Sequence, residues 1–151
     1  MLTKLLKKRF CSKWLFYFLN FTWGLLLTLV GSVYALLFII TLHKPKRFGY
    51  CIAFESKYIG GGLSVGIFIF TCKNPTDYLL QHEHGHAIQN AFYGPLMPFI
   101  VSIPSFTRYH YRNIKRKVFK KKNKTLYDAI WFEAEATALG AMLAENINTA
   151  L

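Results

Sequence analysis

The sequence predicts an α+β protein in which an N-terminal transmembrane helix is followed by a small domain of strands and helices. Three features predict this arrangement. Residues 15–42 form a run of 28 positions without a charged side chain, and 21 of them are apolar. Two short β-rich runs follow this span, and two segments with helix-start signals come after them. The chain is 53% apolar and 17% aromatic, which excludes an intrinsically disordered protein.

The charged residues divide the chain into three parts. Residues 1–14 carry five bases and no acid, residues 15–42 form the predicted transmembrane helix, and residues 43–151 form the predicted domain. As a helix, the uncharged run would extend about 42 Å, against a hydrocarbon core of roughly 30 Å. We therefore expect a single-pass integral membrane protein bound to a lipid bilayer. The five bases before the span would favour a cytoplasmic N-terminus, whereas the fourteen after it favour a cytoplasmic domain, and of these two orientations we favour the second.

The first part of the domain is predicted to be a β-hairpin. Its strands are Gly49–Glu55 and Ser64–Thr71, and the connection between them contains three consecutive glycines. The three cysteines of the chain are odd in number and form no C-x-x-C pair, so we expect free thiols rather than disulfides or a cysteine zinc site.

Two helices are predicted in the rest of the domain. Thr76 or Asp77 can cap a helix that runs to about Tyr93, and the T-x-x-D pattern of residues 125–128 precedes a helix to about Ile147. Between them lie an apolar segment, residues 94–106, interrupted by three prolines, and a basic loop, residues 108–124, with nine Lys or Arg and no acid. The apolar segment is too short to span a membrane. It fits either an interfacial segment or one that packs over the domain core.

The first of these helices carries the pattern H-E-x-x-H as His82-Glu83-x-x-His86. Positions four apart on a helix lie about 40° from each other around the axis, so both imidazoles can reach one metal ion. Glu83 would flank that ion without binding it, which suits a general base for a metal-activated water. His84 should face away from the ion. The competing interpretation is a surface helix with histidines that meet by chance.

The third ligand of a zinc site should come from the last helix, which offers Glu133 and Glu135. These two acids are two positions apart and therefore point to opposite sides. Glu133 shares its face with small residues, which would let two helices approach closely; they are Ala136, Thr137, Gly140 and Ala144. We favour Glu133 as the ligand and expect replacement of Glu135 to have little effect. Solvated acids at both positions are the alternative.

These motifs resemble a known group of proteins. The run His82-Glu83-His84-Gly85-His86, the following Gly-Pro-Leu of residues 94–96, and the aromatic-x-Glu-x-x-Ala-x-x-Leu-Gly of residues 131–140 are similar to a family of small, uncharacterised membrane-associated H-E-x-G-H proteins predicted to be zinc metallopeptidases. The motifs are also similar to those of gluzincins such as thermolysin. The resemblance covers about residues 49–140 and extends more weakly to the N-terminal span.

The resemblance implies a zincin-like domain with a Zn²⁺ cofactor. It implies His82, His86 and Glu133 as zinc ligands, Glu83 as catalytic base, and residues 64–71 as an edge strand for an extended peptide. The chain departs from gluzincins at Thr137, where they often place an aspartate beside a zinc-binding histidine. It also lacks a Tyr or His after the second helix to stabilise an oxyanion. The candidates for that role lie earlier: Tyr109, His110, Tyr111 and Tyr127.

The predicted function is therefore a membrane-anchored zinc metallopeptidase that hydrolyses peptide bonds in a peptide or protein substrate. One alternative is a zinc-binding membrane protein without catalysis. Another is a basic protein that binds anionic headgroups or nucleic acid through residues 108–124, because the net charge is +12 and aromatic residues alternate with the bases. Since this segment lies beside apolar segments, we expect headgroups rather than nucleic acid. The sequence predicts no oligomeric state.

Overall fold

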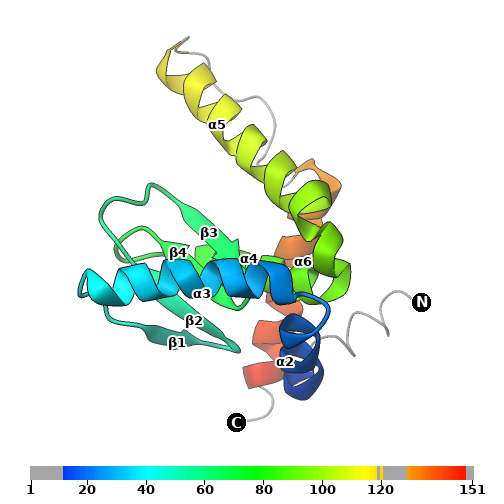
Figure 1. The fold of residues 1–151 in the computed structure, drawn as a ribbon. Helices are drawn as coiled ribbons and strands as arrows, with labels where there is room; N and C mark the ends of the chain where they lie inside the picture. The colour runs from blue at the N-terminus through cyan, green and yellow to red at the C-terminus, as the bar shows by residue number, and fades with distance from the viewer. Residues whose placement is uncertain (1–11, 119, 121–128, 149–151) are drawn as a thin grey trace.

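The computed structural model describes residues 12–118, 120 and 129–148, which form a small mixed sheet surrounded by helices (Figure 1). The helices are α2 (Lys13–Phe21), α3 (Leu25–Ile40), α4 (Asp77–Tyr93), α5 (Ile103–Lys117) and α6 (Trp131–Asn148). The predicted α+β class is confirmed. Several predicted features lie outside the described residues: residues 1–11 of the basic N-terminal segment with Cys11, residues 119 and 121–124 of the basic loop, Tyr127, and the T-x-x-D pattern of residues 125–128.

The sheet has four strands in the order β1-β2-β4-β3. Strands β1 (Lys46–Phe48) and β2 (Cys51–Glu55) form one hairpin, and β3 (Gly62–Val65) and β4 (Phe68–Thr71) form another. Strands β2 and β4 pair in parallel and join the two hairpins. The prediction of one hairpin is therefore wrong: each expected strand region contains a turn, at Gly49 or at Gly66, both with positive φ. The edge strand beside β4 is β3, and β4 itself is internal.

Helices cover both faces of this sheet (Figure 1). On one face, Cys51, Ala53 and Ile69 pack with Ala87 and Ile88 of α4. On the other face, Phe54, Phe70 and Val65 pack with Ala35 of α3. This alternation follows from the two-residue period of a strand, which sends neighbouring side chains to opposite faces. Burial raises the pKa of the Cys51 thiol, and both Cys51 and Cys72 are free, as predicted.

The prediction of one continuous helix over residues 15–42 is wrong. The chain breaks between α2 and α3, whose axes meet at 89°. A buried amide pair holds this bend, because Asn90 of α4 donates to Asn20 Oδ1 at 2.7 Å and to the Gly24 carbonyl at 3.0 Å. Among the described residues, no single helix has the length and apolar character to cross a membrane, although the bent pair together has both.

Helix α3 is apolar on its outer side as well as on the side that faces the sheet. Its buried positions, Thr28, Gly31 and Ala35, follow helical spacing and face the sheet. The outer side exposes about half or more of each large apolar side chain: Leu26, Leu29, Val33, Leu36, Leu37 and Ile40. We call these six residues the outer α3 face.

The region between α4 and α6 is more helical than predicted. The apolar segment contains the 3₁₀ turn η1 (Gly94–Leu96), the π-helical turn η2 (Pro98–Ser102) and the start of α5. Helix α5 then continues to Lys117. The prediction of a basic loop is therefore wrong for residues 108–117, which are helical. Met97 and Val101 are buried against Phe132 of α6, so part of this segment packs on the core. Beyond its first turns α5 projects away from the sheet (Figure 1).

Candidate metal centre

The two histidines of the H-E-x-x-H motif lie on a well-capped helix. The Thr76 hydroxyl accepts a hydrogen bond from the Leu79 N–H at 3.2 Å, so Thr76 caps α4. The helix runs to Tyr93, as predicted. His82 and His86 lie one turn apart on the same side of α4, and their ring centroids are 4.8 Å apart. Both rings are buried, although α4 carries few large apolar residues.

Helix α6 approaches α4 closely through two glycines. A Cβ placed on Gly85 would lie 1.9 Å from the Ala136 carbonyl oxygen, and one on Gly140 would lie 1.9 Å from the Gln81 carbonyl oxygen. Each helix therefore places a glycine against the backbone of the other. This arrangement agrees with the prediction that small residues on the Glu133 face permit a close approach.

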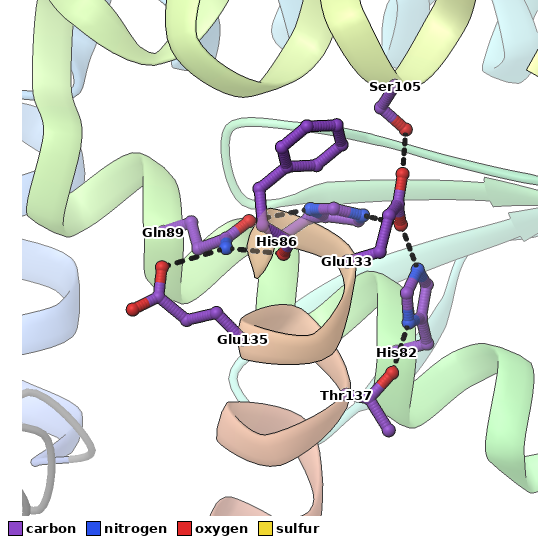
Figure 2. Close-up of polar contacts among 8 residues, drawn as sticks. His82, His86, Gln89, Ser105, Glu133, Glu135 and Thr137 are labelled. Atoms are coloured by element: carbon purple, nitrogen blue, oxygen red, sulfur yellow. Dashed lines mark hydrogen bonds and ion pairs between the residues drawn. The ribbon is translucent and has the colours of Figure 1, made fainter. Parts of the chain in front are cut away.

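The close approach brings Glu133 between the two imidazoles (Figure 2). Its Oε2 atom lies 3.0 Å from His82 Nε2 and 3.3 Å from His86 Nε2. Glu133 is fully buried, and one ligand atom from each of the three residues lies within 4.8 Å of the other two. A buried carboxylate and two ring nitrogens that converge on one point form a set of donors that could bind a metal ion.

Each of the three candidate ligands has a second partner that fixes its orientation (Figure 2). His82 Nδ1 lies 2.9 Å from Thr137 Oγ1, and His86 Nδ1 lies 2.7 Å from Gln89 Oε1. The Ser105 hydroxyl donates to Glu133 Oε1 at 2.5 Å. In each side chain, the nitrogen or oxygen that points away from the other two ligands is thus hydrogen-bonded. His82 Nε2, His86 Nε2 and Glu133 Oε2 are left facing one another.

The electrostatics of the group favour a positive charge at its centre. Burial lowers the pKa of His86, but the hydrogen bond to Glu133 and the charges of Glu83 and Glu133 outweigh this and raise it. Burial would raise the pKa of Glu133, yet the hydrogen bonds to His82 and His86 hold it well below its usual range. Both shifts have the direction expected where a buried carboxylate lies against imidazole rings.

Glu83 lies beside these ligands in the wall of a cavity. The cavity has a volume of about 210 Å³ and is lined by His82, Glu83 and His86, by residues 59–64 of the loop and edge strand β3, and by residues of η2 and α5. Glu83 packs against Gly62, where a Cβ would overlap its carboxylate. Burial raises the pKa of the Glu83 carboxyl, with a further contribution from Glu133, while His86 and His82 oppose the rise.

The candidates for oxyanion stabilisation lie in different places. Tyr109 and His110 of α5 line the cavity, and the Tyr109 hydroxyl lies near Gly60 and Gly61. Tyr111 is largely exposed and does not line this cavity. The structure therefore leaves two described candidates, both on α5.

His84 faces away from the ligands, as predicted, but it is a core residue. It is only 2% exposed and lies among the rings of Phe16, Phe48 and Tyr50. Burial in this aromatic surrounding lowers the pKa of His84 to about 4, so the ring is neutral at pH 7. The Tyr50 N–H donates to its Nε2 at 3.4 Å.

The sequence did not single out Gln89, Ser105 or the surroundings of Glu135. Gln89 follows His86 by three positions, so helical spacing alone could have indicated the contact. Ser105 belongs to the apolar segment, and no sequence signal brings it to Glu133. Glu135 points away from the ligands, as predicted, but it accepts hydrogen bonds from Gln89 and Tyr93.

Comparison of the chain with protein-family models, with curated proteins and with solved structures finds no match. The functional assignment therefore depends on the geometry of the site.

Proposed function

We propose that this protein is a zinc metallopeptidase of the gluzincin type that acts at a membrane surface. The observation that carries the proposal is the buried Glu133 between His82 and His86, with Glu83 in the adjoining cavity wall. Two histidines and one glutamate are the protein ligands of several catalytic zinc sites, in which a fourth position stays open for water or substrate. The open side of this group is the cavity.

The residues around the site suit hydrolysis of an amide. When bound, zinc polarises a carbonyl and makes a water molecule acidic near neutral pH. Glu83 is placed to accept the proton of that water and to pass it to the leaving amine. Its buried carboxyl has a raised pKa, which makes it a stronger base than an exposed glutamate. Tyr109 or His110 across the cavity can donate a hydrogen bond to the carbonyl oxygen.

An extended peptide is the substrate that fits the walls of the cavity. Strand β3 is an edge strand of the sheet and lines the cavity through Gly62, Leu63 and Ser64. An edge strand offers backbone N–H and C=O groups to which a peptide can pair. The buried side chains Met97 and Val101 also line the cavity and suit an apolar substrate side chain.

The outer α3 face supports attachment to a lipid bilayer. An apolar helix face of this extent on a chain with net charge +12 suits insertion into a bilayer with anionic headgroups. Lys44, Lys46 and Arg47 lie within seven residues of the end of α3 and can contact those headgroups, with Lys46 also paired with Glu55 at 2.7 Å. Because the opposite side of α3 packs on the sheet, we propose that the helix lies in the bilayer surface.

Cleavage of a peptide library by the purified full chain tests the proposal. Wild type and Glu83→Gln are incubated with zinc and the library, and the products are identified by mass spectrometry. We expect cleavage by wild type and a loss of about 100-fold or more in Glu83→Gln, because the amide cannot accept the proton. Glu145→Gln, at an exposed position on α6, is the matched control and should cleave like wild type.

Two results would contradict this assignment. Equal cleavage by wild type and Glu83→Gln would exclude Glu83 as the base. Bound zinc without cleavage by any of the three proteins would instead indicate a zinc-binding protein without catalysis.

A further inference from the structure

A chain of hydrogen bonds extends from the metal centre to the far side of α6. It begins at His86, whose Nδ1 lies 2.7 Å from Gln89 Oε1, and Gln89 is fully buried. Gln89 Nε2 then donates to the Phe132 carbonyl at 2.8 Å and to Glu135 Oε2 at 3.1 Å. The Tyr93 hydroxyl donates to the same Glu135 oxygen at 2.7 Å.

The partners of Gln89 determine which way its amide points. A backbone carbonyl and a carboxylate are both acceptors, so the NH₂ group must face Phe132 and Glu135. The amide oxygen must then face His86, as drawn in Figure 2. An amide oxygen only accepts hydrogen bonds, so His86 must carry a proton on Nδ1. Its Nε2 is therefore the atom left to bind a metal.

Glu135 adds a negative charge to this chain. Burial and the hydrogen bond to Glu135 raise the pKa of Tyr93, so its hydroxyl remains a donor. The carboxylate polarises the Gln89 amide, which makes Oε1 a better acceptor for the His86 N–H. A histidine that donates a stronger hydrogen bond through one nitrogen is a better metal ligand through the other.

We propose that Gln89, Glu135 and Tyr93 are positioning residues that hold His86 with Nε2 directed at the metal, and that they raise the affinity of the site. This inference rests on the metal site proposed above. It assigns Glu135 a role that the sequence did not predict, since we expected its replacement to have little effect.

Zinc affinity of the full chain in detergent, measured by competition with a chromophoric chelator, tests the inference. Gln89→Leu removes the acceptor for His86 and should weaken zinc binding by about 10- to 100-fold. Glu135→Gln keeps an oxygen for Tyr93 and removes only the charge, so it should weaken binding less. Glu145→Gln makes the same change at an exposed position of α6 and should bind zinc like wild type.

A double variant separates positioning from a general effect on folding. Gln89→Glu alone places a carboxylate against both Glu135 and the Phe132 carbonyl and should weaken zinc binding, and only the first of these two repulsions can be removed by a change at Glu135. Combining it with Glu135→Gln restores a donor opposite an acceptor, and the new carboxylate faces His86 directly. The double variant should therefore bind zinc more tightly than Gln89→Glu alone. Equal affinity of the double and single variants, or wild-type affinity of Gln89→Leu, would overturn the inference.

The protonation of His86 gives a readout that needs no metal. In ¹⁵N-labelled wild type treated with chelator, His86 Nδ1 should carry a proton that is hydrogen-bonded to Gln89, whether or not Nε2 is also protonated, and Gln89→Leu should lose this hydrogen bond. A ring protonated on Nε2 alone in wild type would overturn the inference even if the protein binds zinc. Absence of zinc binding by wild type would overturn the metal site itself, so the two failures are distinguishable.

Discussion

Gly85 provides the sharpest test of how the two ligand-bearing helices are held together. A Cβ at this position would lie 1.9 Å from the Ala136 carbonyl oxygen, whereas real Cβ atoms are essentially never found within 3.0 Å of such a neighbour. In Gly85→Ala the two helices would have to separate by about 1.1 Å. The obstacle is backbone, so no side-chain rotation can relieve it.

This separation is large for a metal site. Zinc ligand distances vary by about 0.2 Å around their usual values, so Glu133 would lie out of reach while His82 and His86 remained in place. Overpacking a protein core costs about 1–3 kcal/mol of stability. Because the added methyl group of Gly85→Ala would meet backbone, we expect a cost near the upper end of that range. The gain in helix propensity from Gly to Ala is only about 1 kcal/mol, so the overlap should dominate.

We expect Gly85→Ala to lose zinc affinity by about 100-fold or more and to have a Tm several degrees below that of wild type. Chelator competition and thermal unfolding measure the two effects. Gly60→Ala is the matched control, because a Cβ there would meet only the Tyr109 hydroxyl at 3.5 Å, an ordinary contact. Unchanged zinc affinity together with a higher Tm in Gly85→Ala would refute this account of the helix packing.

Three further predictions concern stability, the carboxylate ligand and the membrane. His84 has a pKa lowered to about 4, so its contribution to stability is complete above about pH 6.5 and is lost as the pH falls towards 4. In the presence of chelator, the free energy of unfolding of His84→Gln should therefore fall less on acidification than that of wild type, the difference being roughly 3 kcal/mol at most. Parallel pH profiles of the two proteins would contradict this. Ser105→Ala removes the hydrogen bond to Glu133 and should weaken zinc binding about tenfold; undiminished affinity in chelator competition would exclude that role. Replacing Leu29 and Leu36 of the outer α3 face by aspartate should abolish flotation with anionic vesicles, whereas retained flotation would exclude this face as the attachment surface.

The local features of the fold follow from the sequence more readily than its long-range contacts do. Helix α4 is determined by neighbouring residues and was predicted correctly, and Thr76 is one of the two caps that the sequence offered. The break between α2 and α3 depends on Asn20 meeting Asn90, a contact across 70 positions that no local pattern reveals. Gly49 and Gly66 lie within the two β-rich runs, and glycine is a turn signal. Reading each of them as a turn would have predicted two hairpins.

The three residues of the candidate metal centre were predicted, as was the place of Thr137 beside a histidine, but the rest of the surroundings was not. The helical spacing of His82 and His86 and the small residues beside Glu133 were sufficient to bring the three together. The chain through Gln89 depends on how α4 and α6 cross, and side-chain spacing within one helix does not determine that crossing. His84 was correctly expected to face away from the ligands, but this position does not reveal that aromatic residues pack around it.

Zinc content of the purified full chain tests the central claim most directly. Wild type, Glu133→Ala and Glu145→Ala are exchanged into zinc, dialysed against a weak chelator and measured by elemental analysis. We predict about one zinc per chain in wild type and in Glu145→Ala, and almost none in Glu133→Ala, because two histidines alone hold zinc weakly. No zinc in wild type, or equal zinc in wild type and Glu133→Ala, would contradict the claim that His82, His86 and Glu133 form a metal centre.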